Sequence, residues 1–322
     1  MSQPAERRTW PPKPFLVGAN LPWIDYGCDF GASAWFPGGG LGARPDALAR
    51  FTGLMDRLAA DGVSVVRLFL LCDLRSGVRF DADGDPLGLD DALVRDADAA
   101  FDSAAVRGMR LLPVLFDFHV CAGARAVNGV QVGGRGALLA DPGKRQRLIS
   151  RVVRPVVERY GRHPGVAAWD LFNEPEWCTR PFAPAGGSGV MDLVHMRQCL
   201  AELTACLHAA ACQPVTVGLA SAAHLDLVRG IGLDFYQVHW YDPFGWAALA
   251  GPVDRLGLDR PVLLGEFPGR CATASQADIA SAARHAGYAG ALVWSVASHD
   301  SASLYAGGAA IDAPPRHPGG VG

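Results

Sequence analysis

The stretch VAAWDLFNEPEW, residues 166–177, joins an apolar run to a polar end. Its first seven residues are largely apolar, as expected of a parallel strand covered on both faces. Asn173 and Glu174 follow directly, and Pro175 lacks the N–H that would continue a strand ladder. The stretch therefore predicts a buried strand whose end carries a carboxyl group and an amide.

Similar apolar runs recur along the 322-residue chain and alternate with segments of helical apolar spacing. The runs predicted to be strands are 15–20, 63–70, 110–118, 166–172, 214–220, 234–240, 261–267 and 290–296. The predicted helices are 44–62, 90–108, 141–165, 191–211 and 275–287, with shorter candidates at 222–229 and 244–256.

This alternation, without a Gly-x-Gly-x-x-Gly motif after the first strand, predicts an α/β fold of one (β/α)8 TIM barrel rather than an open Rossmann sheet. We expect a flexible N-terminal segment at 1–14, the barrel at 15–311 and a flexible C-terminal tail at 312–322. The predicted helix-to-strand links are short, whereas the strand-to-helix loops 21–43, 71–89, 119–140 and 175–190 are long. Since TIM-barrel active sites are built from the latter loops, the site should lie at the C-terminal face.

Composition narrows the possible partners. The formal net charge is −3 and no basic stripe is present, so we expect neither a nucleic acid nor a membrane partner. The polar, Pro-rich N-terminus lacks the apolar core of a signal peptide, so we expect a cytoplasmic protein, or a secreted one if the chain has been trimmed. The eight cysteines form no CxxC or zinc-type spacing, so we expect free thiols; a disulfide between rim loops and the oligomeric state stay open.

Polar and aromatic residues gather at the predicted strand ends: Arg67, Asp117, His119, Asn173, Glu174, His239, Trp240, Tyr241, Glu266 and Trp294. Glu174 and Glu266 are the only glutamates there, and their strands, the fourth and seventh, lie across the barrel from each other. Cleavage of a glycosidic bond needs one protonated and one ionised carboxyl group on either side of the bond. Glu176, nearer the loop, is expected to be a solvated charge, or a substrate contact at best.

The motifs FNEP (172–175), HWY (239–241) and GEF (265–267), with VVRL (65–68), DFH (117–119) and VWS (293–295), resemble those of the family 5 glycoside hydrolases, a family of retaining (β/α)8 glycosidases of clan A. The resemblance spans residues 15–300. It implies that Glu174 is the acid/base, that Glu266 is the nucleophile, and that no metal or other cofactor takes part. It further implies substrate contacts by Asn173 at a sugar 2-hydroxyl, by His119 at the glycone and by Trp294 beneath the −1 subsite, with Tyr241 touching the nucleophile, His239 near the acid/base and Arg67 supporting Glu266.

Elementary chemistry agrees with these roles. An arginine beside Glu266 would lower the pKa of this carboxyl and keep it ionised. Aromatic rings offer flat apolar faces to sugars, and about half of the rim tryptophans are expected to line the site: Trp23, Trp35, Trp177, Trp240 and Trp246. Asp117 and His119 could instead be a metal pair, but no further ligand set with the right spacing accompanies them.

The sequence thus predicts a retaining glycoside hydrolase that acts on β-linked carbohydrates of the β-glucan or β-mannan type. Retention requires the two carboxyl groups to be about 5–5.5 Å apart, whereas about 6.5–9.5 Å would favour inversion. A transglycosylase on the same scaffold and a non-catalytic carbohydrate-binding barrel remain alternatives. The sugar, the linkage and the choice between endo and exo action are not decided by the sequence.

Overall fold

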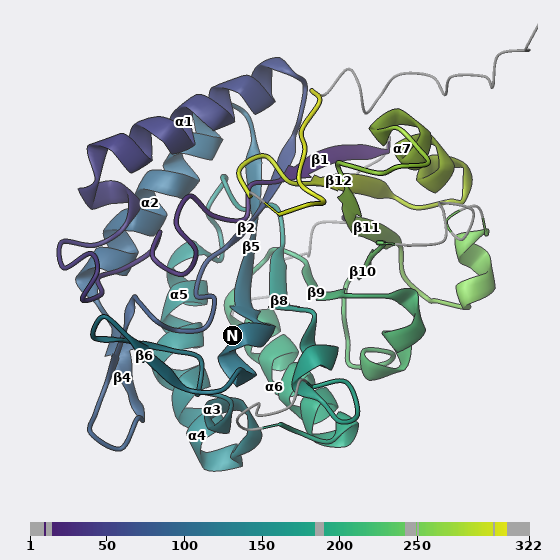
Figure 1. Ribbon diagram of the computed structural model, residues 1–322. Helices are drawn as coiled ribbons and strands as arrows, with labels where there is room; N and C mark the ends of the chain where they lie inside the picture. Colours follow the sequence, from purple (N-terminus) through teal and green to yellow (C-terminus); the bar gives the residue numbers. More distant parts are fainter. Residues whose placement is uncertain are drawn as a thin grey trace, which may run out of the picture.

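The computed structural model describes Trp10 and residues 15–183, 190–241, 249, 251–298 and 300–307. Within these residues eight parallel strands form a closed barrel, in which β1 pairs with both β2 and β12. The strands follow one another around the ring in chain order (Figure 1): β1 (Leu16–Asn20), β2 (Val65–Phe69), β5 (Arg110–Asp117), β8 (Trp169–Asn173), β9 (Val215–Leu219), β10 (Tyr236–His239), β11 (Val262–Pro268) and β12 (Gly290–Trp294). The predicted (β/α)8 fold is confirmed.

The helices lie outside the ring of strands (Figure 1) and bury their apolar faces against it. In α1 (Pro45–Ala60), for example, Phe51, Met55 and Leu58 recur at helical spacing and are all buried. The other helices are α2 (Asp91–Ala105), α3 (Ala137–Ala140), α4 (Pro142–Leu148), α5 (Arg154–Tyr160), α6 (Leu193–Ala210) and α7 (Gln276–His285), with a π-turn (Ile149–Val153) joining α4 to α5.

Two of the predicted short helices differ from the structure. The segment predicted at 222–229 is a 3-10 turn, η5 (Ala222–Leu227), and the described part of 244–256 holds another, η7 (Val253–Leu256). Residues 242–248 and 250 lie outside the described residues. No described helix is both long and apolar enough to cross a lipid bilayer.

Two of the long loops contain small antiparallel hairpins that the sequence analysis did not predict. The loop 71–89 holds β3 (Val78–Phe80) and β4 (Pro86–Leu89), and the loop 119–140 holds β6 (Arg125–Val127) and β7 (Val130–Val132). Strands of three or four residues are too short to give a period-two pattern. The loop 21–43 is ordered differently: the buried Asp96 carboxylate accepts hydrogen bonds from the backbone N–H groups of Gly31, Gly40 and Gly42.

The N-terminal end of the barrel is closed by Trp10. Its ring is 4% exposed and lies 4.3 Å from the ring of Phe235, centroid to centroid, within an apolar cluster that includes Leu16 and Leu263. The predicted flexible segment 1–14 stays a prediction; of its residues the structure describes Trp10, and this side chain is buried. The rest of that segment and the predicted tail 312–322 lie outside the described residues.

Candidate active site

A cavity of about 430 Å³ opens at the C-terminal face of the barrel. It lies where the loop lengths placed the site. The described residues that line it come from strand ends and from the loops that follow them: Trp23, Tyr26, Phe69, Asp117, Phe118, His119, Asn173, Glu174, Tyr241, Glu266, Trp294, Asp300, Ser301 and Ala302.

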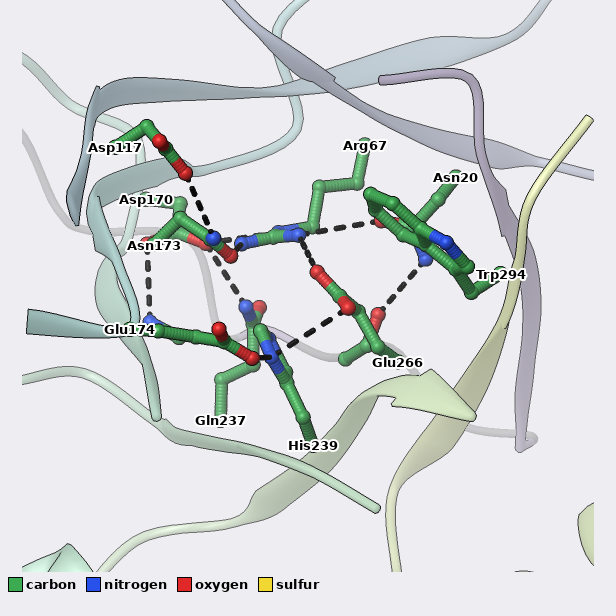
Figure 2. Close-up of polar contacts among 12 residues, drawn as sticks. Asn20, Arg67, Asp117, Asp170, Asn173, Glu174, Gln237, His239, Glu266 and Trp294 are labelled. Carbon is green, nitrogen blue, oxygen red and sulfur yellow. Dashed lines mark hydrogen bonds and ion pairs between the residues drawn. The ribbon is translucent and has the colours of Figure 1, made fainter. Parts of the chain in front are cut away.

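Arg67 on β2 is the centre of the polar network beneath this cavity (Figure 2). Its side chain is fully buried, and Nε donates to Asp170 Oδ2 at 2.9 Å. Nη1 donates to Glu266 Oε1 at 2.6 Å and to Asn20 Oδ1 at 3.2 Å, and Nη2 donates to Asn173 Oδ1 at 2.8 Å. One planar guanidinium thus fixes side chains from β1, β8 and β11, which a lysine could not do with one ammonium group.

Glu266 on β11 is held at both oxygens. Arg67 occupies Oε1, and the Tyr241 hydroxyl donates to Oε2 at 2.7 Å. Burial raises the pKa of Glu266, while the charge of Arg67 and the hydrogen bond from Tyr241 oppose the rise. The prediction of a lowered pKa is therefore wrong in its net direction: Arg67 acts as expected, but burial outweighs it.

Glu174 follows β8 in a left-handed conformation, with φ 52° and ψ 55°. Its Oε1 lies 2.9 Å from His239 Nδ1, and its Oε2 accepts from Trp177 Nε1 at 3.1 Å. Burial, with the charge of Asp117, raises the pKa of Glu174 to about 7. Burial lowers the pKa of His239 to about 4, so this imidazole is neutral where Glu174 titrates.

Asp117 on β5 organises the side of the cavity next to Asn173. It accepts from Asn173 Nδ2 at 3.0 Å and from the Tyr26 hydroxyl at 2.9 Å, and it pairs with His119 Nδ1. Although burial opposes the change, the hydrogen bond and charge of Asp117 raise the pKa of His119. The half-exposed His119 ring thus lines the cavity in an orientation fixed by Asp117.

Of the four rim tryptophans that the structure describes, Trp23 alone lines the cavity, fewer than the expected half. Its ring meets that of Trp294, the predicted floor of the −1 subsite, edge to face, with centroids 5.9 Å apart. Trp177 is 40% exposed and touches Glu174, but neither it nor Trp240 is among the described residues that line the cavity. Trp35 donates to the Val127 carbonyl in β6, and Trp246 lies outside the described residues.

Three residues of the polar network around Arg67 were not predicted from the sequence: Asn20, Gly218 and Gln237. Asn20 donates to the backbone carbonyls of Gly265 and Val293, and Gln237 on β10 donates to Asp170 Oδ2 at 2.8 Å. A Cβ on Gly218 of β9 would lie 2.6 Å from Gln237 Nε2 and 2.9 Å from Arg67 Nη2, so only glycine leaves room for the network. The sequence does show a signal for these residues: each is an isolated polar or glycine position within an otherwise apolar strand.

Glu176 was expected to be a solvated charge. Its exposed fraction is only 1%, so that prediction is wrong.

One atom each of Glu174, His239 and Glu266 lie within 4.8 Å of one another, a set that could in principle hold a cation. However, Arg67 and Tyr241 already donate to both oxygens of Glu266, and a cation there would face the guanidinium. The expectation that no metal takes part stays a prediction.

A (β/α)8 barrel with two glutamates facing each other across its C-terminal cavity is the arrangement of a glycoside hydrolase. No family model matches the chain. A mannan endo-1,4-beta-mannosidase of Cryptopygus antarcticus is 24% identical over 324 residues, which cover 88% of this chain and 80% of that protein. A protein of the same name from Mytilus edulis is 26% identical over 168 residues, 52% of this chain and 41% of that protein.

Solved structures with the same fold include the β-1,4-D-mannanase of Cryptopygus antarcticus, with a TM-score of 0.75 and 22% identity over 90% of this chain and 86% of that one. The endo-1,4-β-mannanase of Eisenia fetida gives a TM-score of 0.74 and 22% identity over 94% of this chain and 90% of that one. These comparisons confirm the predicted class: the chain is a (β/α)8 glycoside hydrolase that resembles the family 5 enzymes.

Proposed function

We propose that this protein hydrolyses β-1,4-linked mannan or its oligosaccharides with retention of anomeric configuration, using Glu174 as acid/base and Glu266 as nucleophile. The single observation that carries the proposal is the pair of glutamates with unequal surroundings at one cavity. An oxygen of Glu174 lies within 4.8 Å of an oxygen of Glu266, which supports the retaining mechanism over the wider spacing of about 6.5–9.5 Å that inversion needs.

In the first step the ionised Glu266 attacks the anomeric carbon while the bond from that carbon to the leaving oxygen breaks. Glu174 gives its proton to the leaving oxygen, which departs as an alcohol. A pKa of about 7 keeps Glu174 protonated in slightly acidic solution. Arg67 and Tyr241 hold the attacking carboxylate in place, so little motion is needed at the moment of reaction.

In the second step Glu174 takes a proton from water, and the water oxygen attacks the anomeric carbon and releases Glu266. Formation of the glycosyl ester has by then removed the charge of Glu266. Since the charges of Glu174 and Glu266 disfavour each other, this loss makes Glu174 easier to ionise. One carboxyl group can therefore act first as acid and then as base.

The substrate assignment rests on the mannan endo-1,4-beta-mannosidases of Cryptopygus antarcticus and Mytilus edulis. The cavity is chemically suited to a sugar: Trp294 and Trp23 offer apolar ring faces, and Asn173 and His119 offer polar groups to hydroxyls. Hydrolysis of soluble mannan should therefore exceed that of soluble β-glucan.

A panel of aryl β-glycosides (manno, gluco, galacto and xylo) run beside soluble mannan and β-glucan tests the proposal, with product anomers followed by NMR. We expect mannan cleavage with the β-anomer formed first. Glu266→Gln should abolish turnover while mannooligosaccharide binding, measured by calorimetry, persists. Formation of the α-anomer first would refute retention, wild-type activity in Glu266→Gln would refute the nucleophile, and a preference for β-glucan would refute the substrate.

A further inference from the structure

Glu176 is a second buried carboxyl group beside the acid/base, and the mechanism above does not use it. It lies on the 3-10 turn η4 (Pro175–Cys178), directly after the left-handed Glu174 and Pro175. Its Oε1 accepts a hydrogen bond of 2.7 Å from the backbone N–H of Ala220, just beyond β9. Its Oε2 is buried without a hydrogen-bond partner. Such a group is costly to bury, so it calls for an explanation.

The backbone conformation of Glu174 explains why a carboxyl group is buried at position 176. A non-glycine residue in the left-handed region is strained and persists only where its surroundings determine it. Here two hydrogen bonds tie this turn to the end of β9. The N–H of Glu174 donates to the Gly218 carbonyl at 2.7 Å, and the carboxyl group of Glu176 accepts from Ala220. The second bond is made by a side chain and can be removed without deleting backbone.

The surroundings of Glu176 favour its uncharged form. Among the described residues no basic side chain pairs with it; backbone N–H groups of Ala220 and Ser221 face it from beyond β9, and the charged neighbour on its own turn is Glu174. Burial and, more weakly, the charge of Glu174 raise the pKa of Glu176 to about 8, against the hydrogen bonds from the backbone.

We propose that Glu176 is a positioning residue that acts as a neutral carboxylic acid: it clamps the left-handed turn to the end of β9 and thereby aims the carboxyl group of Glu174 at the leaving oxygen. This inference rests on the proposed function, because it assigns Glu174 the proton transfer. The clamp itself, however, is a property of the fold and can be measured without a substrate.

The kinetic test compares 2,4-dinitrophenyl and phenyl β-glycosides of one mannooligosaccharide. The dinitrophenolate leaves without a proton, whereas phenolate needs the acid. Glu176→Ala should lower kcat on the phenyl substrate roughly 10- to 100-fold, because small misplacement of a catalytic group costs that much, and should lower it much less on the dinitrophenyl substrate. Glu176→Gln keeps an acceptor for Ala220 and should rescue most of the loss at pH 6. Glu158→Gln, the same change on the exposed face of α5, is the matched control.

Equal losses on both substrates, or no loss on either, would overturn the positioning role.

The thermal test needs no substrate. A carboxyl group whose folded pKa is raised makes the folded state bind more protons than the unfolded one, so stability falls as pH rises from about 4.5 to about 8 and is then level. The Tm of Glu176→Gln should therefore exceed that of the wild type by a margin that widens across this window, unlike that of Glu158→Gln. A constant margin would overturn the neutral acid. If the wild type cleaves no glycoside but the margin widens, the proposed function fails while the clamp stands.

Discussion

Replacing Tyr241 by phenylalanine removes one hydrogen bond from Glu266, the proposed nucleophile, and leaves the rest of the network in place. The hydroxyl donates to Glu266 Oε2 at 2.7 Å, while Arg67 holds the other oxygen. The Tyr241 side chain is 39% exposed, so its truncation leaves no buried cavity. The variant should fold and should differ from the wild type chiefly at the charge of Glu266.

The expected loss of rate in Tyr241→Phe follows from the charge of Glu266. A hydrogen bond to a charged group contributes about 1.5–3 kcal/mol, and each 1.36 kcal/mol corresponds to a tenfold change in rate. The bond is formed most fully when Glu266 departs as a carboxylate in the second step, so that step should slow roughly 10- to 100-fold. The first step consumes the same charge and should slow less, so the glycosyl-enzyme should accumulate.

The hydrogen bond also opposes the raised pKa of Glu266. Without it the pKa rises further, and the acidic limb of the profile of kcat/KM against pH moves to higher pH. Stopped-flow release of 2,4-dinitrophenol should show a burst of about one equivalent followed by a slow steady rate. Tyr236→Phe is the matched control, since Tyr236 also donates to a carboxylate, Asp259, but at the opposite end of β10. A burst-free variant with an unmoved acidic limb would refute the reasoning.

Three further predictions follow from the same structure. Because the proposed mechanism needs a protonated Glu174 and burial raises the pKa of this residue to about 7, kcat/KM should fall as pH rises through about 7; a plateau extending to pH 9 would contradict this. Gly218→Ala should lower activity at least roughly tenfold by displacing the guanidinium of Arg67, whereas Gly53→Ala, at a position with no atom within 4 Å of the added carbon, should not. Thiol titration should find eight free cysteines after denaturation, but in the native protein only Cys212 and Cys271 should react readily, since the others are buried; fewer than eight would indicate a disulfide.

The barrel could be predicted because its signals are local. Each strand carries an apolar run that the sequence displays directly, and loop lengths distinguish the two faces of the barrel. The meeting of Glu174 and Glu266 at one cavity follows from their position at the ends of such runs. The burial of Trp10 and of Glu176 could not be predicted in this way, since it depends on what lies across the fold: the apolar base of the barrel in one case and the end of β9 in the other.

The pKa of Glu266 also depends on features that the sequence does not show. The sequence places an arginine near a carboxylate, from which a lowered pKa follows if the pair lies in water. In the structure Glu266 and Arg67 are both buried, so the loss of solvation opposes the pair and the pKa of Glu266 rises instead. The sequence indicates which charged residues meet, but how deeply they are buried depends on the packing of the whole fold.

Burial raises the pKa of both glutamates, so burial alone cannot decide which one carries the proton. Their partners decide it. Glu266 has a permanent cation and a phenol donating to it, and both favour its charged form. Glu174 has a neutral imidazole and an indole N–H, and its larger neighbouring charge is the anion Asp117. A single proton shared by the two sites therefore lies on Glu174. Removing the cation should shrink this difference: in Arg67→Met the pKa of Glu266 should rise further, and the acidic limb of the profile of kcat/KM against pH should move to higher pH as activity falls.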